Sequence, residues 1–138
     1  MRIVLDTNVV ISALIWGGTP YRLIEAAVDG GLELYTSPAL LAELHAVLAR
    51  KHLASRLQRL GSSVDEAVAL YAALAISVSP PEVPPVVPGD SDDDHVIAAA
   101  VSTGADLLVS GDGHLLAVEQ HFSIRIVTPA EAVAQIDK

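Results

Sequence analysis

Four carboxylates stand far apart in the chain, each at a place where a carboxylate could do chemistry. Asp6 directly follows a short apolar run, and Asp112 follows another in Gly-Asp-Gly. Glu43 lies among apolar residues of a predicted helix, and Asp94 lies in the first turn of another. Two bare carboxylates about 4 Å apart repel by roughly 4 kcal/mol at an effective dielectric of 20. A fold that gathers all four must therefore protonate some of them or bind cations.

The donor types indicate which cations would suit such a cluster. The chain has no cysteine, which excludes disulfides and thiolate metal sites. Hard carboxylate oxygens favour Mg²⁺ or Mn²⁺. Such ions polarise a phosphodiester and lower the pKa of a bound water, and a two-metal site would hold its ions roughly 3.5–4 Å apart.

Each carboxylate also has an ordinary structural interpretation. Asp6 could only cap the next helix, because Asp is a good N-cap residue. Asp94 could only favour the positive end of its helix. Glu43 could be solvated, and Asp112 could be a turn residue.

Strand and helix patterns alternate along the chain. Strands are predicted at residues 2–5, 32–35, 75–78, 107–110 and 124–127. Helices are predicted at 9–15, 21–29, 38–48, 52–60, 64–74, from 91 or 92 to 104, at 115–119 and after Thr128. N-cap signals are Thr19-Pro20, Ser37-Pro38, Ser63 with Glu66, and Thr128-Pro129 with Glu131.

Alternating strands and helices predict an α/β fold with a parallel sheet covered on both faces. Sites in such sheets gather at the carboxyl ends of the strands, where Asp6 and Asp112 are expected. The proline-rich segment from Ser79 to Gly89 is interpreted as a loop inside one domain, 1–138, because the remaining chain is too short to fold alone.

Composition narrows the class of protein. Of the 138 residues, 51% are hydrophobic but only 4% aromatic, so aliphatic side chains must fill the core. No apolar run is long enough to span a membrane, and the N-terminus does not read as a signal peptide. The lack of cysteine fits a cytoplasmic protein.

The net charge of −9 argues against nonspecific adhesion to nucleic acid. One segment is locally basic despite the negative net charge. Its candidate RNA contacts are Arg50, Lys51, Arg56 and Arg59, and it also contains His52. A solvated helical face explains the same cluster equally well.

Several motifs together resemble PIN-domain proteins, most of all the toxin components of bacterial toxin–antitoxin systems (VapC-like ribonucleases). They are VLDTNVVISAL, the Glu in PALLAELHAVL, DSDDDHVIAAAVSTGADLLVSGD and the following HLL. The resemblance implies a three-layer α/β/α sandwich with a mostly parallel sheet. It also implies an Mg²⁺- or Mn²⁺-dependent endoribonuclease that hydrolyses RNA with a metal-activated water.

The resemblance assigns roles residue by residue. Asp6, Glu43, Asp94 and Asp112 match the family's catalytic and metal-binding carboxylates. Asp94 is preferred to Asp93 because the family places this acid three residues before the apolar run that starts at Ile97. The residues expected to support these carboxylates by hydrogen bonds or other polar contacts are Thr7, Asn8, Ser110 and Asp93.

The resemblance implies two protein partners, a cognate antitoxin and a second copy of the chain. Leu14, Ile15 and Trp16 could form a dimer interface or be buried in the core.

Three rival functions remain open. A phosphatase that uses an Asp after its first strand needs a second Asp where Asn8 stands. The others are a receiver-like domain and a catalytically inert PIN-like module that binds RNA or a partner.

Overall fold

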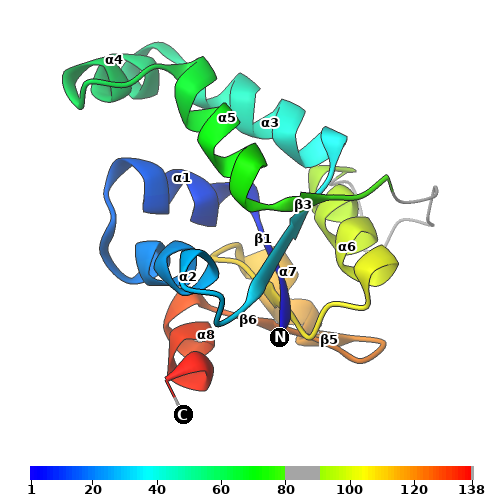
Figure 1. Ribbon diagram of the computed structural model, residues 1–138. Helices are drawn as coiled ribbons and strands as arrows, with labels where there is room; N and C mark the ends of the chain where they lie inside the picture. The colour runs from blue at the N-terminus through cyan, green and yellow to red at the C-terminus, as the bar shows by residue number, and fades with distance from the viewer. Residues whose placement is uncertain (80–90, 138) are drawn as a thin grey trace.

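A computed structural model describes residues 1–79 and 91–137, without the side chains of residues 91–93. Its six-stranded sheet has the order β3-β2-β1-β4-β6-β5 (Figure 1). The strands are β1 Arg2–Leu5, β2 Glu33–Thr36, β3 Ile76–Ser77, β4 Leu107–Val109, β5 Gln120–His121 and β6 Ile124–Val127. All neighbours pair parallel except β5 and β6, which confirms the mostly parallel sheet.

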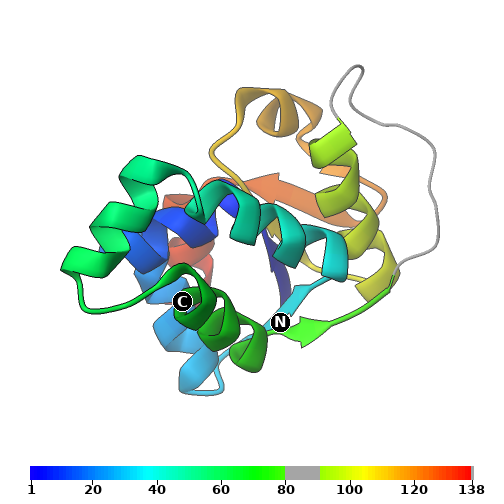
Figure 2. The same cartoon turned by 90° about the horizontal axis from the view of Figure 1, so that it is seen from above.

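Helices cover both faces of the sheet, so the molecule has three layers. They are α1 Thr7–Ile15, α2 Gly18–Val28, α3 Pro38–Leu48, α4 Lys51–Arg59, α5 Val64–Leu74, α6 Ser91–Thr103, α7 Gly113–Val118 and α8 Pro129–Ile136. Figure 2 shows α6 and α7 on one side of the strands and α1 and α2 on the other. The predicted α/β/α sandwich is confirmed.

The alternation of β1 explains the two layers of core. Ile3 and Leu5 belong to the apolar cluster shared with α1, α2 and α8, whereas Val4 belongs to the cluster shared with α6 and α7. Successive side chains of a strand point to opposite faces. The buried part of β1, Ile3–Leu5, is therefore apolar on both faces, and Asp6 is the first polar side chain after it.

Side-chain caps position the helices that follow the strands. The Ser37 hydroxyl accepts a hydrogen bond from the Leu40 N–H, and Thr128 forms a full capping box with Glu131. Ser63 accepts from the Glu66 N–H at the start of α5. These three predicted caps are confirmed, and each contributes about 1 kcal/mol.

One local prediction is wrong, and one strand was missed. Helix α2 is capped by Gly17 and begins at Gly18, so Thr19 lies inside its first turn. Gly17 has φ 73° and ψ −126°, a backbone conformation that glycine adopts without steric cost. The sequence pattern also gave no sign of β5, which is only two residues long.

Three further expectations concern the proline-rich connection, the possible interface at Leu14, Ile15 and Trp16, and membrane-spanning helices. The proline-rich connection lies outside the described residues except for Ser79, and so do the side chains of Ser91 and Asp92, the two predicted caps of α6. Ile15 is buried in the core and Leu14 packs against it, which leaves Trp16, 61% exposed, as the open member of the expected interface. No helix in the described ranges is long and apolar enough to cross a bilayer.

Candidate active site at the carboxyl edge of the sheet

Asp6 is a buried carboxylate, 7% exposed, at the carboxyl end of β1. Its backbone N–H donates to the Val109 carbonyl of β4, which fixes it at the edge of the sheet. Its Oδ1 accepts from the Thr7 N–H at 2.8 Å, and Asp6 is the N-cap of α1. Asp6 therefore does cap α1, but capping uses only Oδ1 and leaves Oδ2 for a second interaction.

Ser110 connects the ends of β1 and β4. Its hydroxyl donates to Asp6 Oδ2 at 2.8 Å and accepts from the Asp112 N–H at 2.9 Å. The side chain is fully buried, and its own N–H donates to the Val127 carbonyl of β6. Ser110 therefore orients Asp6 and holds the loop that carries Asp112.

Asp112 is the N-cap of α7 rather than a free turn residue. Its Oδ1 accepts from the His114 N–H at 3.0 Å, and its side chain is 26% exposed. The His114 ring lies 4.0 Å from the same oxygen and is largely exposed. The cap holds the carboxylate near the Ser110 loop while keeping part of it open to solvent.

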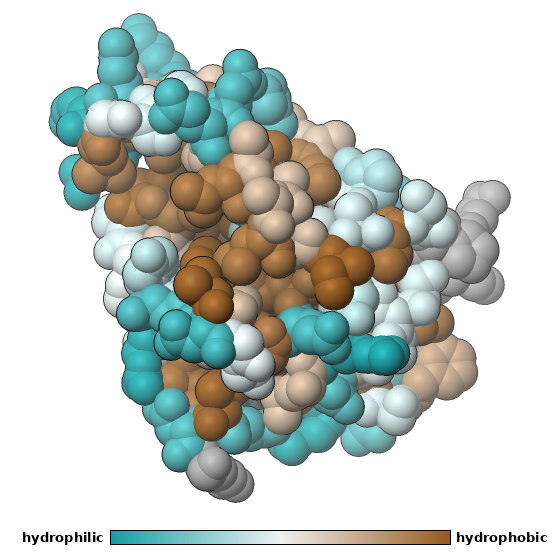
Figure 3. Space-filling view, viewed as in Figure 1, coloured by the Kyte–Doolittle hydropathy of each residue, from teal (hydrophilic) through white to brown (hydrophobic). Residues whose placement is uncertain are grey.

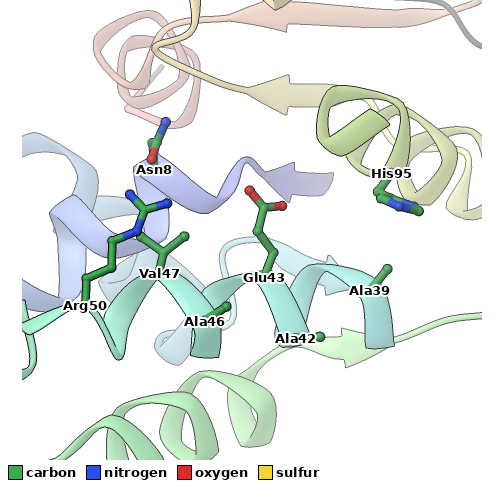
Figure 4. A pocket seen from close by; sticks show the side chains of 8 residues that line it. All are labelled: Asn8, Ala39, Ala42, Glu43, Ala46, Val47, Arg50 and His95. Atoms are coloured by element: carbon green, nitrogen blue, oxygen red, sulfur yellow. The ribbon is translucent and has the colours of Figure 1, made fainter. Parts of the chain in front are cut away.

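Glu43 faces a pocket of about 590 Å³ between α1, α3 and the start of α6. Figure 4 shows its carboxylate directed away from α3 into the space below Asn8. The described lining residues are Asn8, Ala39, Ala42, Glu43, Ala46, Val47, Arg50 and His95. The solvated-face interpretation of Glu43 is therefore too simple, because the side chain lines a concave surface.

Asp94 lies in the first turn of α6, partly buried and next to His95 of the same pocket. The side chains of Asp92 and Asp93 lie outside the described part of the structure. Asp6 and Asp112 are thus joined through Ser110, while Glu43 and the neighbour of Asp94 share a pocket. Among the described side chains, no three of Asp, Glu and His are spaced to bind one metal ion.

The donor chemistry of the four candidates nevertheless suits a divalent cation. All four candidate donors are carboxylates, carried at or beside one edge of the sheet. The Thr7 hydroxyl, next to Asp6 in the chain, is buried without a hydrogen-bond partner within residues 1–79 and 91–137. A buried polar atom left unpaired in a native fold often marks a water or an ion.

The basic residues divide into two groups. Arg50 lines the pocket with Glu43, whereas Lys51, His52, Arg56 and Arg59 are exposed residues of α4. Figure 1 places α4 at the far end of α3 from β3. Only Arg50 of the predicted RNA contacts therefore lines the described pocket.

Sequence reasoning missed the alanines that open the pocket. Ala39, Ala42 and Ala46 lie at positions i, i+3 and i+7 of α3, on the same face as Glu43. Small side chains at this spacing beside a single Glu were the sequence signal that could have predicted a pocket on this face of α3. They make room in front of the carboxylate.

The comparisons with known proteins identify the family and the fold of the chain. A family model described as PIN domain matches residues 2–114, which include β1, Glu43, Asp94 and Asp112. The chain belongs to the PIN domain family. An uncharacterized protein of Methanocaldococcus jannaschii is 25% identical over 150 aligned positions, which cover 100% of this chain and 93% of that protein.

The PIN fold is also found in the solved structures. The crystal structure of VapBC2 from Rickettsia felis, bound to a DNA fragment from its promoter, matches with a TM-score of 0.62. The match covers 93% of this chain and 98% of that chain at 13% identity. At this identity the likeness supports the fold, and activity must be argued from the residues.

Proposed function

We propose that this PIN domain is an Mg²⁺- or Mn²⁺-dependent endoribonuclease, and that it is the toxin component of a toxin–antitoxin system. The observation that carries the proposal is the pairing of Asp6 with Ser110, whose hydroxyl also binds the backbone of Asp112. A buried carboxylate held by two donors at a strand end is a rigid ligand. Family membership supplies the reaction class.

In the proposed mechanism, Asp6, Glu43, Asp94 and Asp112 are the residues that would hold the metal beside the RNA phosphate. When bound, the divalent cation offsets the negative charge of the carboxylates and acts as a Lewis acid toward the phosphodiester. Ser110 keeps Asp6 in one orientation through its hydrogen bond, a kind of support that typically affects metal affinity or activity 10–100-fold. Asn8 and Asp93 are assigned further polar contacts.

The main test is cleavage of mixed RNA oligonucleotides with Mg²⁺, Mn²⁺ or EDTA. Asp6→Asn and Asp94→Asn should each lower metal-dependent cleavage by about 100-fold or more, a larger loss than that expected for a supporting residue. Asp29→Asn is the matched control, because Asp29 is an exposed carboxylate that precedes β2 at the opposite edge of the sheet. Cleavage that survives both site substitutions would refute the assignment.

An inert module that binds RNA or a partner is the second candidate. It is favoured by the absence of a preformed three-ligand group among the described side chains. Calorimetric titration of wild type and Asp6→Asn with Mn²⁺, combined with the cleavage assay, separates the two candidates. Metal binding with no cleavage of any RNA would support the inert module.

The proposed toxin would act on RNA in the cytoplasm and be silenced by a cognate antitoxin. An antitoxin that places a basic side chain near Glu43 and Asp6 would complement the acidic site and the net charge of −9. The VapBC2 structure contains a promoter DNA fragment, which is a property of that complex. A short neighbouring reading frame for a DNA-binding protein would support the same arrangement here.

A further inference from the structure

The pocket in front of α3, called the α3 groove below, has a basic residue at one end and an acidic residue further along it. Ala39, Ala42 and Ala46 line it, Glu43 stands in its middle and Arg50 closes one end. Its volume of about 590 Å³ is in the range of pockets that hold ligands of drug size. Such a groove accommodates a nucleotide or two of one strand rather than a folded RNA helix.

Arg50 is an unusual residue for its place in the fold. It is the N-cap of α4, with backbone φ −59° and ψ 137°, and its side chain makes no capping hydrogen bond. N-caps are normally Ser, Thr, Asp or Asn, and a positive charge near a helix N-terminus is unfavourable. Helix stability therefore gives no reason for Arg at this position.

The guanidinium is instead directed along the groove. Figure 4 shows it beneath Asn8, on the same side of α3 as Glu43. Among the side chains that the structure describes, the ion pairs are those of Arg22, His45 and His114, so Arg50 is in none of them. An exposed guanidinium at a pocket wall is suited to bind a phosphate through two N–H groups.

Spacing decides which phosphate Arg50 would bind. Arg50 lies seven residues after Glu43 and beyond the end of α3 at Leu48, so the two side chains enter the groove at different places along it. A guanidinium at the end of the groove, away from Glu43, is placed for a neighbouring phosphate of the same strand. No Phe, Tyr or Trp is among the described lining residues, so the groove holds the backbone rather than stacked bases.

Resting on the proposed function, we propose that the α3 groove binds single-stranded RNA, with Arg50 holding a phosphate one or two nucleotides from the one that is cut. Arg50 is a substrate-binding residue that does not touch the reacting atoms. Loss of such a contact weakens the ground state and the transition state equally, so KM rises while kcat stays unchanged.

The test compares Arg50→Asn with Lys51→Ala. Both remove one positive charge at the N-terminus of α4, but only Arg50 lines the pocket. Arg50→Asn should raise KM for single-stranded RNA about 10-fold, leave kcat within about twofold, and reduce the salt slope of binding by about 0.7. It should also raise the urea midpoint of unfolding, because Asn is a better N-cap than Arg.

A chemical scan locates the phosphate. In oligonucleotides with one neutral methylphosphonate, a single position next to the cut should weaken binding to wild type and have no further effect on Arg50→Asn. Equal effects of Arg50→Asn and Lys51→Ala would overturn the proposal, since the loss would then reflect net charge alone.

Binding measured by fluorescence anisotropy separates this proposal from the nuclease assignment. Binding without cleavage, weakened in Arg50→Asn only, would refute the nuclease and support the groove. Cleavage with an unchanged KM in Arg50→Asn would refute the groove and keep the nuclease. Wild type that neither binds nor cuts RNA would overturn both.

Discussion

The Ser110 hydroxyl is both donor and acceptor, to Asp6 Oδ2 and from the Asp112 N–H. Because all of these atoms are at or near the buried end of β4, truncating Ser110 leaves two polar groups with one partner fewer. A buried donor or acceptor left unpaired costs about 1–3 kcal/mol. The residue therefore links fold stability to the geometry of the candidate site.

Ser110→Ala should lower the free energy of unfolding by about 1–3 kcal/mol and metal-dependent RNA cleavage by about 10–100-fold. Urea denaturation and initial cleavage rates measure the two effects. Ser102→Ala, an exposed serine of α6, should change neither. Wild-type cleavage by Ser110→Ala would show that Asp6 needs no help in orientation.

The sequence predicted the identity of the site residues better than their contacts. Asp6 and Asp112 could be placed at strand ends because an apolar run precedes each. The resemblance assigned polar support to Ser110, but its contacts could not be predicted from the pattern, since the bond to Asp6 depends on β1 and β4 being neighbours in the sheet. The four-carboxylate cluster itself stays a prediction, because the structure joins Asp6 to Asp112 but shows no complete metal-binding group among the described side chains.

Helix α5 contains a buried tyrosine, Tyr71, whose burial makes the stability of the fold depend on pH. Tyr71 is 2% exposed within the main apolar cluster, and its hydroxyl has no hydrogen-bond partner in the described ranges. Burial raises the pKa of Tyr71 well above its usual value near 10. Folding thus favours the neutral phenol, and stability that is fully present below pH 10 is lost as the pH rises further.

Tyr71→Phe should keep or raise stability at pH 7, by up to about 2 kcal/mol, because it removes an unpaired buried hydroxyl. Above pH 10 it should lose less stability than wild type, since Phe does not ionise. Urea unfolding at both pH values measures the difference, with the exposed Tyr21→Phe as control. Identical alkaline losses in all three proteins would contradict the assignment to Tyr71.

Helix starts were predictable where a side-chain oxygen caps the first turn. Ser37 and Thr128 are such cases, each followed by proline. The same signal failed at Thr19, because Gly17 and Gly18 both have positive φ and begin the helix earlier. Pro20 is still tolerated there, since the first four N–H groups of a helix have no intrahelical partner.

The whole molecule has one face with much apolar surface. Figure 3 shows apolar side chains over α1, α5 and β3 on this face. Exposed large apolar residues of these elements include Leu70 of α5 and Ile76 of β3, which are 59% and 45% exposed. β3 is an edge strand, and edges with exposed apolar residues favour association with another chain.

We propose a homodimer that uses this face. Light scattering should give twice the monomer mass for wild type, and Leu70→Glu should shift the protein to monomer, because a charge in an apolar interface is costly. Phe122→Glu is the control, since Phe122 is 76% exposed but lies in the turn between β5 and β6. A monomeric wild type at micromolar concentration would remove the proposal.

The overall architecture followed from the alternation of strand and helix patterns, which requires a parallel sheet with helical crossovers. The order of the strands was not available from that pattern. It arises because β1 pairs with β2 on one side and with β4 on the other. That placement gathers chain segments around Asp6 that are far apart in sequence.

The hydrogen bond from Ser110 to Asp6 joins residues 104 positions apart. On the ribosome the N-terminal segment emerges first and must wait for almost all of the domain before it meets this partner. A growing polypeptide therefore lacks the assembled carboxylate edge until translation has passed β4. Under the proposed function, an unfinished chain would therefore not yet be able to cleave RNA, including its own mRNA.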